Sequence, residues 1–277
     1  MILLYVVLSI FVVIHGENSP IVQTGHGPVI GLSETSRSGK NFYSFRKIPY
    51  AKPPLGNLRF KVHINKVQQF FRVPRSFYST VDDATPGNYG YKDMVLALKW
   101  VQENINNFGG NKHKVTIFGQ SIGGIAVHYM ILSPAGKNLF HWVISQSGTA
   151  LNIWGYPKAS FHPTSTFSKL HNVIFFLNFK IFSNEPSTIF STVNEAKNPL
   201  NSELFLTKGP MKILQSGHFN QVPWITGITS DDGIIKASPL VRLSNTLKQL
   251  NANFDKLGPQ LLFLPLSRIK CNLYGMI

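Results

Sequence analysis

The chain begins with an apolar block. Residues 2–14 read ILLYVVLSIFVVI, and the first charged side chain after them is Glu17. A block of this length at an N-terminus, closed by a small residue, is typical of a secretory signal peptide. It is shorter than the roughly 18–20 apolar residues that a membrane-spanning helix needs, and no other run in the chain reaches that length. We therefore predict a signal peptide over residues 1–16 and a secreted, extracellular domain over residues 17–277. A buried strand or a signal anchor is the alternative for the block.

After this block, short β-rich stretches alternate with turns. Candidate strands cover residues 21–24, 28–30 and 42–45, and glycine-containing turns separate them. Residues 94–108 then place apolar groups at helical spacing, and Gly109-Gly110 ends the predicted helix; these groups are Val95, Leu98, Val101, Ile105 and Phe108.

The middle of the chain alternates strands with helices. Residues 115–118 form a predicted strand, and residues 122–132 form a predicted helix. Residues 140–145 and 222–228 are two more short apolar strands. This alternation favours an α/β domain with a largely parallel sheet. Two stretches break the pattern: residues 61–75 are basic and irregular, and the apolar run at 173–182 reads as a buried strand or an aggregation-prone segment.

Composition narrows the classes of function. The 277 residues are 43% hydrophobic, which supports a folded core, and the single cysteine, Cys271, excludes a disulfide framework or a zinc site built on several cysteines. The formal net charge is +15. Residues 40–75 contain nine basic side chains and no acid. They form either a patch that binds anionic surfaces or a solvated face. We favour the solvated face because the chain has no nucleic-acid-binding motif. We expect no metal, cofactor or nucleic-acid partner.

One motif carries chemistry. Residues 119–123, Gly-Gln-Ser-Ile-Gly, match G-x-S-x-G between a predicted strand and a predicted helix. That context is typical of a nucleophile elbow, in which a strained turn exposes the serine oxygen. Ser121 would be the nucleophile, the Ile122 amide would form part of the oxyanion hole, and Gly119 and Gly123 would both be needed to avoid clashes. The alternative is an ordinary glycine-rich connection.

The sequence around this motif resembles a known family. The similar stretches include GNYGYKDMVLALKWVQENINNFGGNKHKVTIFGQSIGG, LFHWVISQSGTAL, FYSFRKIPYAKPPLGNLRFK and QVPWITGITSDDG. They resemble the carboxylesterase type B family, the cholinesterase-like branch of the α/β-hydrolases, and most closely its insect esterases. The resemblance covers most of residues 19–62, 76–155 and 203–264, and it implies hydrolysis of carboxylic esters without a cofactor.

A serine nucleophile needs a carboxylate and a histidine. Asp232 is the best-placed acid, because it follows the strand 222–228 at the edge where ligands bind in open α/β sheets. The resemblance agrees, since the family's catalytic Glu lies in a D-E-G motif that reads Asp231-Asp232-Gly233 here. The alternative is a solvated loop acid.

The sequence offers no catalytic histidine at the expected place. No histidine follows Asp232, and the last one, His218, precedes the strand that leads to it. We expect His218 at the edge of the sheet opposite Ser121, and His128 and His141 in structural or surface roles. The resemblance implies a catalytic histidine well beyond Asp232. It also implies a core strand and an H-G-G-G-type oxyanion loop after Lys61, where residues 62–75 depart from the family pattern.

We therefore predict an α/β-hydrolase fold with a largely parallel sheet and helices on both faces, incomplete because an inner strand and the C-terminal part are missing. The predicted function is a serine-type hydrolase of small-molecule carboxylic esters, catalytically impaired by the absent histidine and oxyanion loop. One alternative is a non-catalytic, cholinesterase-like binding or adhesion protein. The other is a splice or gene-model fragment with junctions near 62–75, 156–184 and 265–277. The sequence leaves the oligomeric state open.

Overall fold

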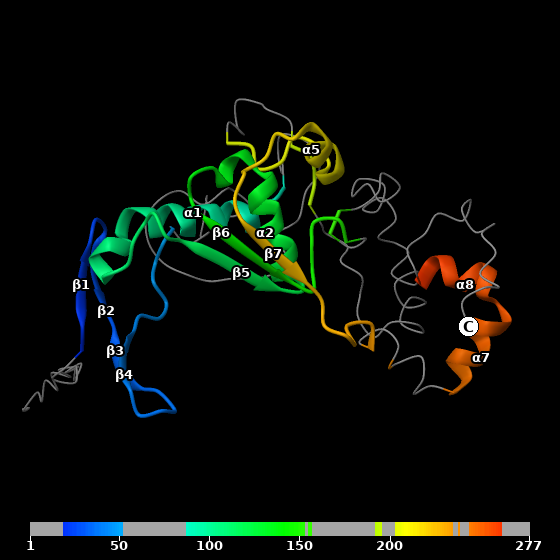
Figure 1. Ribbon diagram of the computed structural model, residues 1–277, viewed down its shortest axis with the longest axis horizontal. Coiled ribbons are helices and arrows are strands. Elements are labelled where there is room, and N and C mark those ends of the chain that lie inside the picture. Colours follow the sequence, from blue (N-terminus) through cyan, green and yellow to red (C-terminus); the bar gives the residue numbers. More distant parts are fainter. Residues whose placement is uncertain are drawn as a thin grey trace, which may run out of the picture.

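The computed structural model describes residues 19–51, 87–152, 155–156, 192–195, 203–234, 238 and 244–261. The predicted signal peptide, the basic segment 61–75, the apolar run 173–182 and Cys271 lie outside the described residues. Figure 1 shows an arm of short strands, a central sheet with helices on one side, and a separate helical pair near the C-terminus.

The arm consists of two antiparallel hairpins. Strand β1 (Ile21–Thr24) pairs with β2 (Gly27–Ile30), and β3 (Leu32–Thr35) pairs with β4 (Asn41–Ser44). Gly27, the first residue of β2, and Gly39, in the turn between β3 and β4, have positive φ angles of 111° and 77°, which favour glycine. Strand β1 has the predicted bounds, and β2 and β4 each begin one residue earlier than predicted. Strand β3 was not predicted, because three of its four residues are polar.

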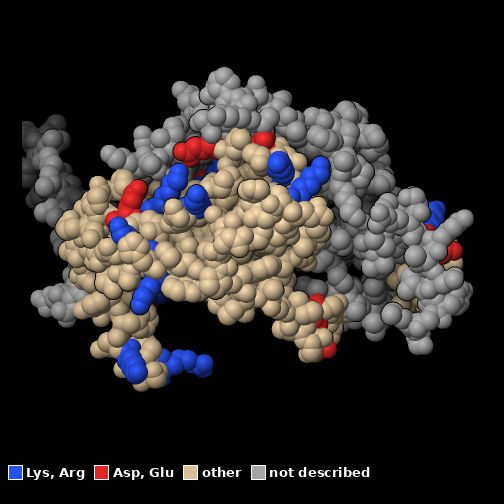
Figure 2. Space-filling view, turned by 45° about the horizontal axis from the view of Figure 1, so that its top comes forward, with Lys and Arg blue, Asp and Glu red and all other residues tan. Residues whose placement is uncertain are grey.

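Aromatic and amide contacts attach the arm to the first helix. The rings of Phe45 and Phe108 meet edge-on at 4.8 Å. The Asn107 side chain donates to the Gln23 carbonyl, and the Asn104 side chain accepts from the Gly25 amide. Figure 2 shows basic side chains gathered at the free end of the arm; those of the described residues 36–47 are Arg37, Lys40, Arg46 and Lys47.

The first helix, α1 (Tyr89–Asn104), continues into the 3₁₀ turn η3 (Ile105–Phe108) and ends at Gly109, whose φ is 77°. The prediction of a helix over 94–108 therefore missed its first turn. That turn carries Lys92 and Asp93, polar side chains that are buried in the fold. Hydrophobic periodicity does not detect a helix whose buried face is charged.

The central sheet has three parallel strands. They are β5 (Thr116–Gln120), β6 (Trp142–Gln146) and β7 (Trp224–Gly227), in the order β5-β6-β7. Each strand was predicted within two residues of its observed ends. Helix α2 (Ile122–Leu132) follows β5 directly and packs on β5 and β6, and the turn η4 (Pro134–Gly136) then leads to β6. Parallel strands with an intervening helix are the βαβ unit that the sequence predicted.

The hydrophobic core lies between α2, the sheet face beneath it, and α1. The side chains of Tyr129, Ile125 and Phe205 are 1% exposed or less, and Tyr91 of α1 stacks on Phe205 with ring centroids 4.8 Å apart. Helix α5 (Pro210–Ser216) closes this core through Ile213. Helix α2 is buried along almost all its length, which explains why its sequence is apolar on every face.

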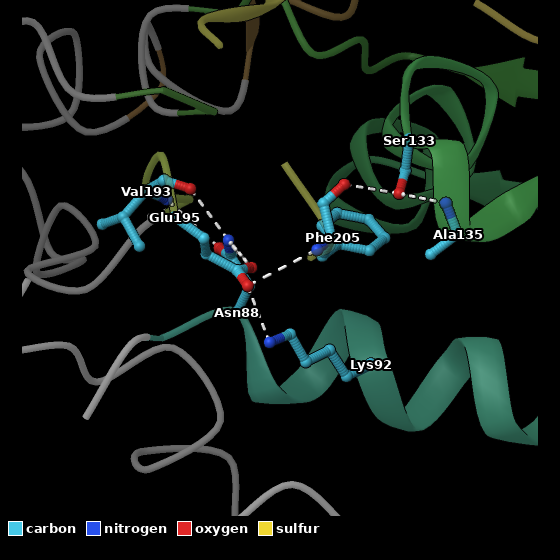
Figure 3. Close-up of polar contacts among 7 residues, drawn as sticks. All are labelled: Asn88, Lys92, Ser133, Ala135, Val193, Glu195 and Phe205. Atoms are coloured by element: carbon cyan, nitrogen blue, oxygen red, sulfur yellow. Dashed lines mark hydrogen bonds and ion pairs between the residues drawn. The ribbon is translucent and has the colours of Figure 1, made fainter. Parts of the chain in front are cut away.

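A buried polar cluster joins α1 to Val193, Glu195 and Phe205 (Figure 3). Lys92 Nζ lies 2.7 Å from Glu195 Oε2, and the Asn88 side chain donates to Glu195 Oε1 at 2.6 Å and to the Val193 carbonyl at 2.8 Å. The Ser133 hydroxyl donates to the Phe205 carbonyl at 2.5 Å. The charges are buried as a hydrogen-bonded pair, as the cost of burial requires.

The last described helices, α7 (Ser244–Ala252) and α8 (Phe254–Leu261), contact each other. Across the described ranges, no helix combines the length and the apolar character needed to cross a membrane.

Candidate active site

Ser121 occupies a sharp turn between β5 and α2. Its backbone has φ 56° and ψ −116°, a conformation that residues with a Cβ rarely adopt. The Ser121 amide donates to the Gln146 carbonyl of β6 at 2.8 Å, and the Ser121 carbonyl accepts from the Ile125 amide at 3.1 Å. The side chain is exposed at the carboxyl end of the sheet. This is the strand–turn–helix geometry expected of a nucleophile elbow.

The glycines around the turn have different roles. A Cβ at Gly119 would overlap the carbonyl group of Gly123, so residue 119 must be glycine. A Cβ at Gly123 would meet nothing within 4 Å, so the clash argument predicted from the sequence does not apply there. Gly148 is a requirement that the sequence reasoning missed, because a Cβ there would overlap the Ser121 carbonyl oxygen.

The Ile122 amide stands at the start of α2. The first amides of a helix have no partner within that helix, and the helix dipole makes this end attractive to negative charge. The Ile122 amide follows Ser121 directly in the chain. It can therefore donate to an oxygen that becomes negatively charged when Ser121 attacks a carbonyl group.

Asp232 lies in the turn after β7, at the same edge of the sheet as Ser121. Hydrogen bonds from the hydroxyls of Ser147 and Thr229 lower the pKa of Asp232 below the usual range. The Thr229 hydroxyl lies 2.7 Å from Asp232 Oδ1. Ser147 follows β6, has a φ of 54°, and donates its amide to the Gly227 carbonyl of β7 at 2.8 Å. Asp232 is therefore held as a carboxylate at neutral pH.

The carboxyl ends of all three strands therefore converge. Strand β5 leads to Ser121, β6 leads to Ser147 and Gly148, and β7 leads to the turn with Asp232. Gly148 lies against the Ser121 backbone, and the amide of its neighbour Ser147 donates to the Gly227 carbonyl of β7. The predicted nucleophile Ser121 and the predicted acid Asp232 therefore lie at the same edge of the sheet, and their roles stay predictions.

The described histidines lie elsewhere. His128 is 1% exposed, and its Nδ1 accepts from the Ala150 amide at 3.1 Å. His141 Nδ1 accepts from the Val115 amide at the amino end of β5. His218 is exposed and lies before β7. Among the described residues, no histidine hydrogen bonds to Ser121 or Asp232, and no three His, Cys, Asp or Glu side chains gather as a metal site.

Comparisons with known proteins agree on one family. The sequence profile of the Carboxylesterase family matches residues 18–70 and 67–265. A juvenile hormone esterase of Tribolium castaneum is 33% identical over 90% of this chain and 61% of its own length. Venom carboxylesterase-6 of Apis mellifera is 35% identical over 68% of this chain and 37% of its own length. The chain thus spans about three fifths of the first relative and less of the second.

A solved structure shows the same fold. The crystal structure of juvenile hormone esterase from Manduca sexta, with OTFP covalently attached, superposes with a TM-score of 0.67. It is 22% identical, and the match covers 89% of this chain and 67% of that one. The chain therefore has the α/β-hydrolase fold that the sequence predicted, and its described residues include the parallel sheet β5-β6-β7.

Proposed function

Because the chain belongs to the carboxylesterase family, we propose that the carboxyl edge of its sheet is a serine-type site for small-molecule carboxylic esters. Ser121 Oγ would attack the ester carbonyl carbon, the alcohol would leave, and water would release the acid from the acyl-serine. The Ile122 amide would stabilise the oxyanion, and Asp232 would orient a base. The position of Ser121 and Asp232 after the carboxyl ends of β5 and β7, at one edge of the sheet, carries this proposal.

We further propose that these 277 residues perform this chemistry poorly. No histidine follows Asp232 in the sequence, and a serine without a base is a weak nucleophile. Loss of a triad member lowers kcat by several orders of magnitude. The purified chain should therefore hydrolyse a p-nitrophenyl ester no faster than its Ser121→Ala variant.

The matched control is Ser38→Ala, an exposed serine in the β3–β4 turn. A monodisperse preparation in which Ser121→Ala abolishes rapid hydrolysis, while Ser38→Ala does not, would show that the chain has a working base. Equal, slow rates in all three proteins agree with the proposal.

A second proposal concerns the junction near residues 62–75. The family profile matches in two pieces that meet at residues 67–70. The alignment with the Tribolium protein runs over 357 positions, more than the 277 residues of this chain, so that relative carries stretches with no counterpart here. Both observations support an internal deletion produced by splicing or gene modelling.

Transcripts across residues 60–76 test the junction directly. Under this proposal, long reads from the locus include a form that encodes a G-G-G-type loop after Lys61. Abundant reads that match the present junction, with none that contain the loop, would contradict the deletion. They would favour the non-catalytic binding role instead.

Secretion remains our proposal for the location. The uncharged block at residues 2–14 supports it, and the family match begins at residue 18, just after the predicted cleavage site. In a secretory host, the protein recovered from the medium should begin at Glu17. A product that keeps residues 1–16 and stays with the cells would contradict cleavage.

A further inference from the structure

A buried serine connects the first turn of α2 to the strands beneath it. Ser145 is the fourth residue of β6 and is 1% exposed. Its hydroxyl lies 3.2 Å from the Gly124 carbonyl oxygen and 3.0 Å from the Trp224 indole nitrogen of β7. An indole nitrogen can only donate and a carbonyl oxygen can only accept. The Ser145 hydroxyl therefore accepts from Trp224 and directs its own proton to Gly124.

Gly124 lets the helix approach the end of β6 closely enough for this contact. A Cβ on Gly124 would lie 2.7 Å from the Gly148 carbonyl oxygen and 3.0 Å from the Gln146 carbonyl oxygen. Real Cβ atoms do not approach backbone oxygens at such distances, so a side chain there would displace the helix from β6. The bond from Ser145 to the first turn of α2 thus depends on a glycine at residue 124.

Two peptide groups continue this contact to the nucleophile turn. The Gly124 carbonyl belongs to the same peptide as the Ile125 amide, and that amide donates to the Ser121 carbonyl at 3.1 Å. The Ser121 carbonyl in turn belongs to the same peptide as the Ile122 amide. A carbonyl that accepts a hydrogen bond makes the amide of its own peptide a stronger donor, and bonds in such a chain polarise one another. The chain of bonds that begins at Trp224 therefore ends at the Ile122 amide.

We propose that Ser145 is a positioning residue for the ester chemistry of Ser121. Its hydroxyl, held by Trp224, orients and polarises the Ile122 amide through the first turn of α2; we call this the Ser145 relay. The inference rests on the proposed function, because the Ile122 amide acts only when an oxyanion forms beside Ser121. The buried hydroxyl acts through the backbone, and its effect belongs to the reaction step, in which negative charge develops on the oxygen.

Modification of Ser121 by a fluorophosphonate, with added imidazole as the base, measures this step. Ser121 Oγ forms a bond to phosphorus, fluoride leaves, and imidazole takes the proton. Varying the probe concentration separates the apparent dissociation constant of the probe from the maximal rate constant of modification. Ser145→Ala should lower the maximal rate constant by about three- to tenfold, as expected for the loss of one hydrogen bond, with an unchanged apparent dissociation constant.

Ser133→Ala is the matched control. Ser133 is also a buried serine whose hydroxyl accepts from an amide, that of Ala135, and donates to a carbonyl, that of Phe205. It follows the last residue of α2, at the end away from Ser121. Its loss should therefore lower thermal stability much as Ser145→Ala does, because each variant removes one buried hydroxyl, but should leave the maximal rate constant unchanged.

Trp224→Phe tests the first bond of the relay. It keeps an aromatic ring but removes the indole donor, so it should lower the maximal rate constant less than Ser145→Ala does. In the Ser145→Ala background it should cause no further loss of rate, because the bond that it removes is already gone.

The Ile122 amide also provides a readout that needs no reaction. Within residues 17–277, serine precedes isoleucine only at Ser121-Ile122, so carbonyl-¹³C serine combined with ¹⁵N-isoleucine selects that peptide alone in an NMR spectrum. In Ser145→Ala the Ile122 amide resonance should move upfield, because its peptide is less polarised. In Ser133→Ala it should keep its position.

The outcomes separate this inference from the function on which it rests. Equal loss of rate in Ser145→Ala and Ser133→Ala, or no loss in either, would overturn the relay and leave the proposed function intact. An Ile122 resonance that does not respond to Ser145→Ala would also overturn the relay, whatever the rates. If Ser121 of the unaltered chain were not modified even with imidazole, the proposed function would fail, and the part of Ser145 in it would fail too.

Discussion

At the scale of single residues, Gly119 fixes the shape of the nucleophile turn. A Cβ at this position would overlap the Gly123 carbonyl, two residues after Ser121. Gly119→Ala should lower the free energy of unfolding by about 1–3 kcal/mol, as overpacking does. Gly123→Ala is the matched control, because its Cβ would be free of contacts and alanine favours a helix by about 0.5–1 kcal/mol. Denaturant titration compares the two variants, and equal losses would contradict this account of the turn.

His128 is a second residue whose chemistry follows from its place. It is buried against Trp224 with ring centroids 4.3 Å apart, and its Nε2 finds no hydrogen-bond partner among the described residues. Burial lowers the pKa of His128 from 6.5 to about 4. Below pH 6.5 the unfolded chain therefore binds a proton that the folded chain excludes until about pH 4, so acid favours unfolding.

Stability should accordingly fall as the pH is lowered from 6.5 to 4. The full difference in pKa corresponds to about 3 kcal/mol. In His128→Gln, whose amide oxygen can still accept from Ala150, this part of the pH dependence should disappear. The exposed His218→Gln variant should keep it. Urea unfolding at a series of pH values measures the effect, and identical pH profiles in both variants would refute it.

At the scale of elements, the Lys92–Glu195 pair connects α1 to the segment 192–195. Both side chains are buried, with 6% and 0% exposed. Lys92→Met should cost about 3–5 kcal/mol, because it leaves a buried carboxylate without its cation. Adding Glu195→Gln should recover part of that loss, since the amide oxygen can still accept from Asn88.

The exposed Lys99–Glu203 pair is the matched control for the buried Lys92–Glu195 pair. Its nitrogen and oxygen are 3.4 Å apart, and its side chains are 38% and 75% exposed. Lys99→Met should change stability by about 0.5 kcal/mol or less. Thermal unfolding measures both effects. A Lys92→Met/Glu195→Gln variant that is less stable than Lys92→Met alone would contradict the predicted recovery.

The same elements show which parts of the fold can be predicted from the sequence. The spacing of apolar residues predicted β5, α2, β6 and β7 because each is an apolar segment bounded by turns. It missed β3, where three of the four residues are polar, and the first turn of α1, where Lys92 and Asp93 are buried. Such elements depend on distant partners, which local pattern does not contain.

The candidate site likewise contains residues that the sequence singled out and one that it did not. Ser121 was predicted because its motif encodes the turn locally, and Asp232 because strand ends locate it. Ser147 was not singled out, since its backbone hydrogen bond to Gly227 depends on the pairing of β6 with β7. Contacts made across a sheet require its strand order before a sequence can reveal them.

At the scale of the whole molecule, net charge opposes association. Each chain carries a formal charge of +15, so two copies repel when salt is low. The screening length falls from about 10 Å at 0.1 M salt to about 3 Å at 1 M. The second virial coefficient of the chain, measured by static light scattering, should therefore be positive at 0.1 M salt and fall towards zero at 1 M. A coefficient that instead rises with salt would show that the copies attract each other through opposite charges.

We propose that this edge of the sheet holds Ser121 as a nucleophile and Asp232 as an acid, and no described histidine lies there as a base. This claim is tested most directly by the rate at which a fluorophosphonate modifies Ser121, measured by peptide mass spectrometry with and without added imidazole. Attack by Ser121 Oγ forms the O–P bond and expels fluoride, and imidazole takes the proton. We predict slow modification that imidazole accelerates, confined to Ser121 and lost in Ser121→Ala. Rapid modification without imidazole, or equal modification of Ser121→Ala, would contradict the claim.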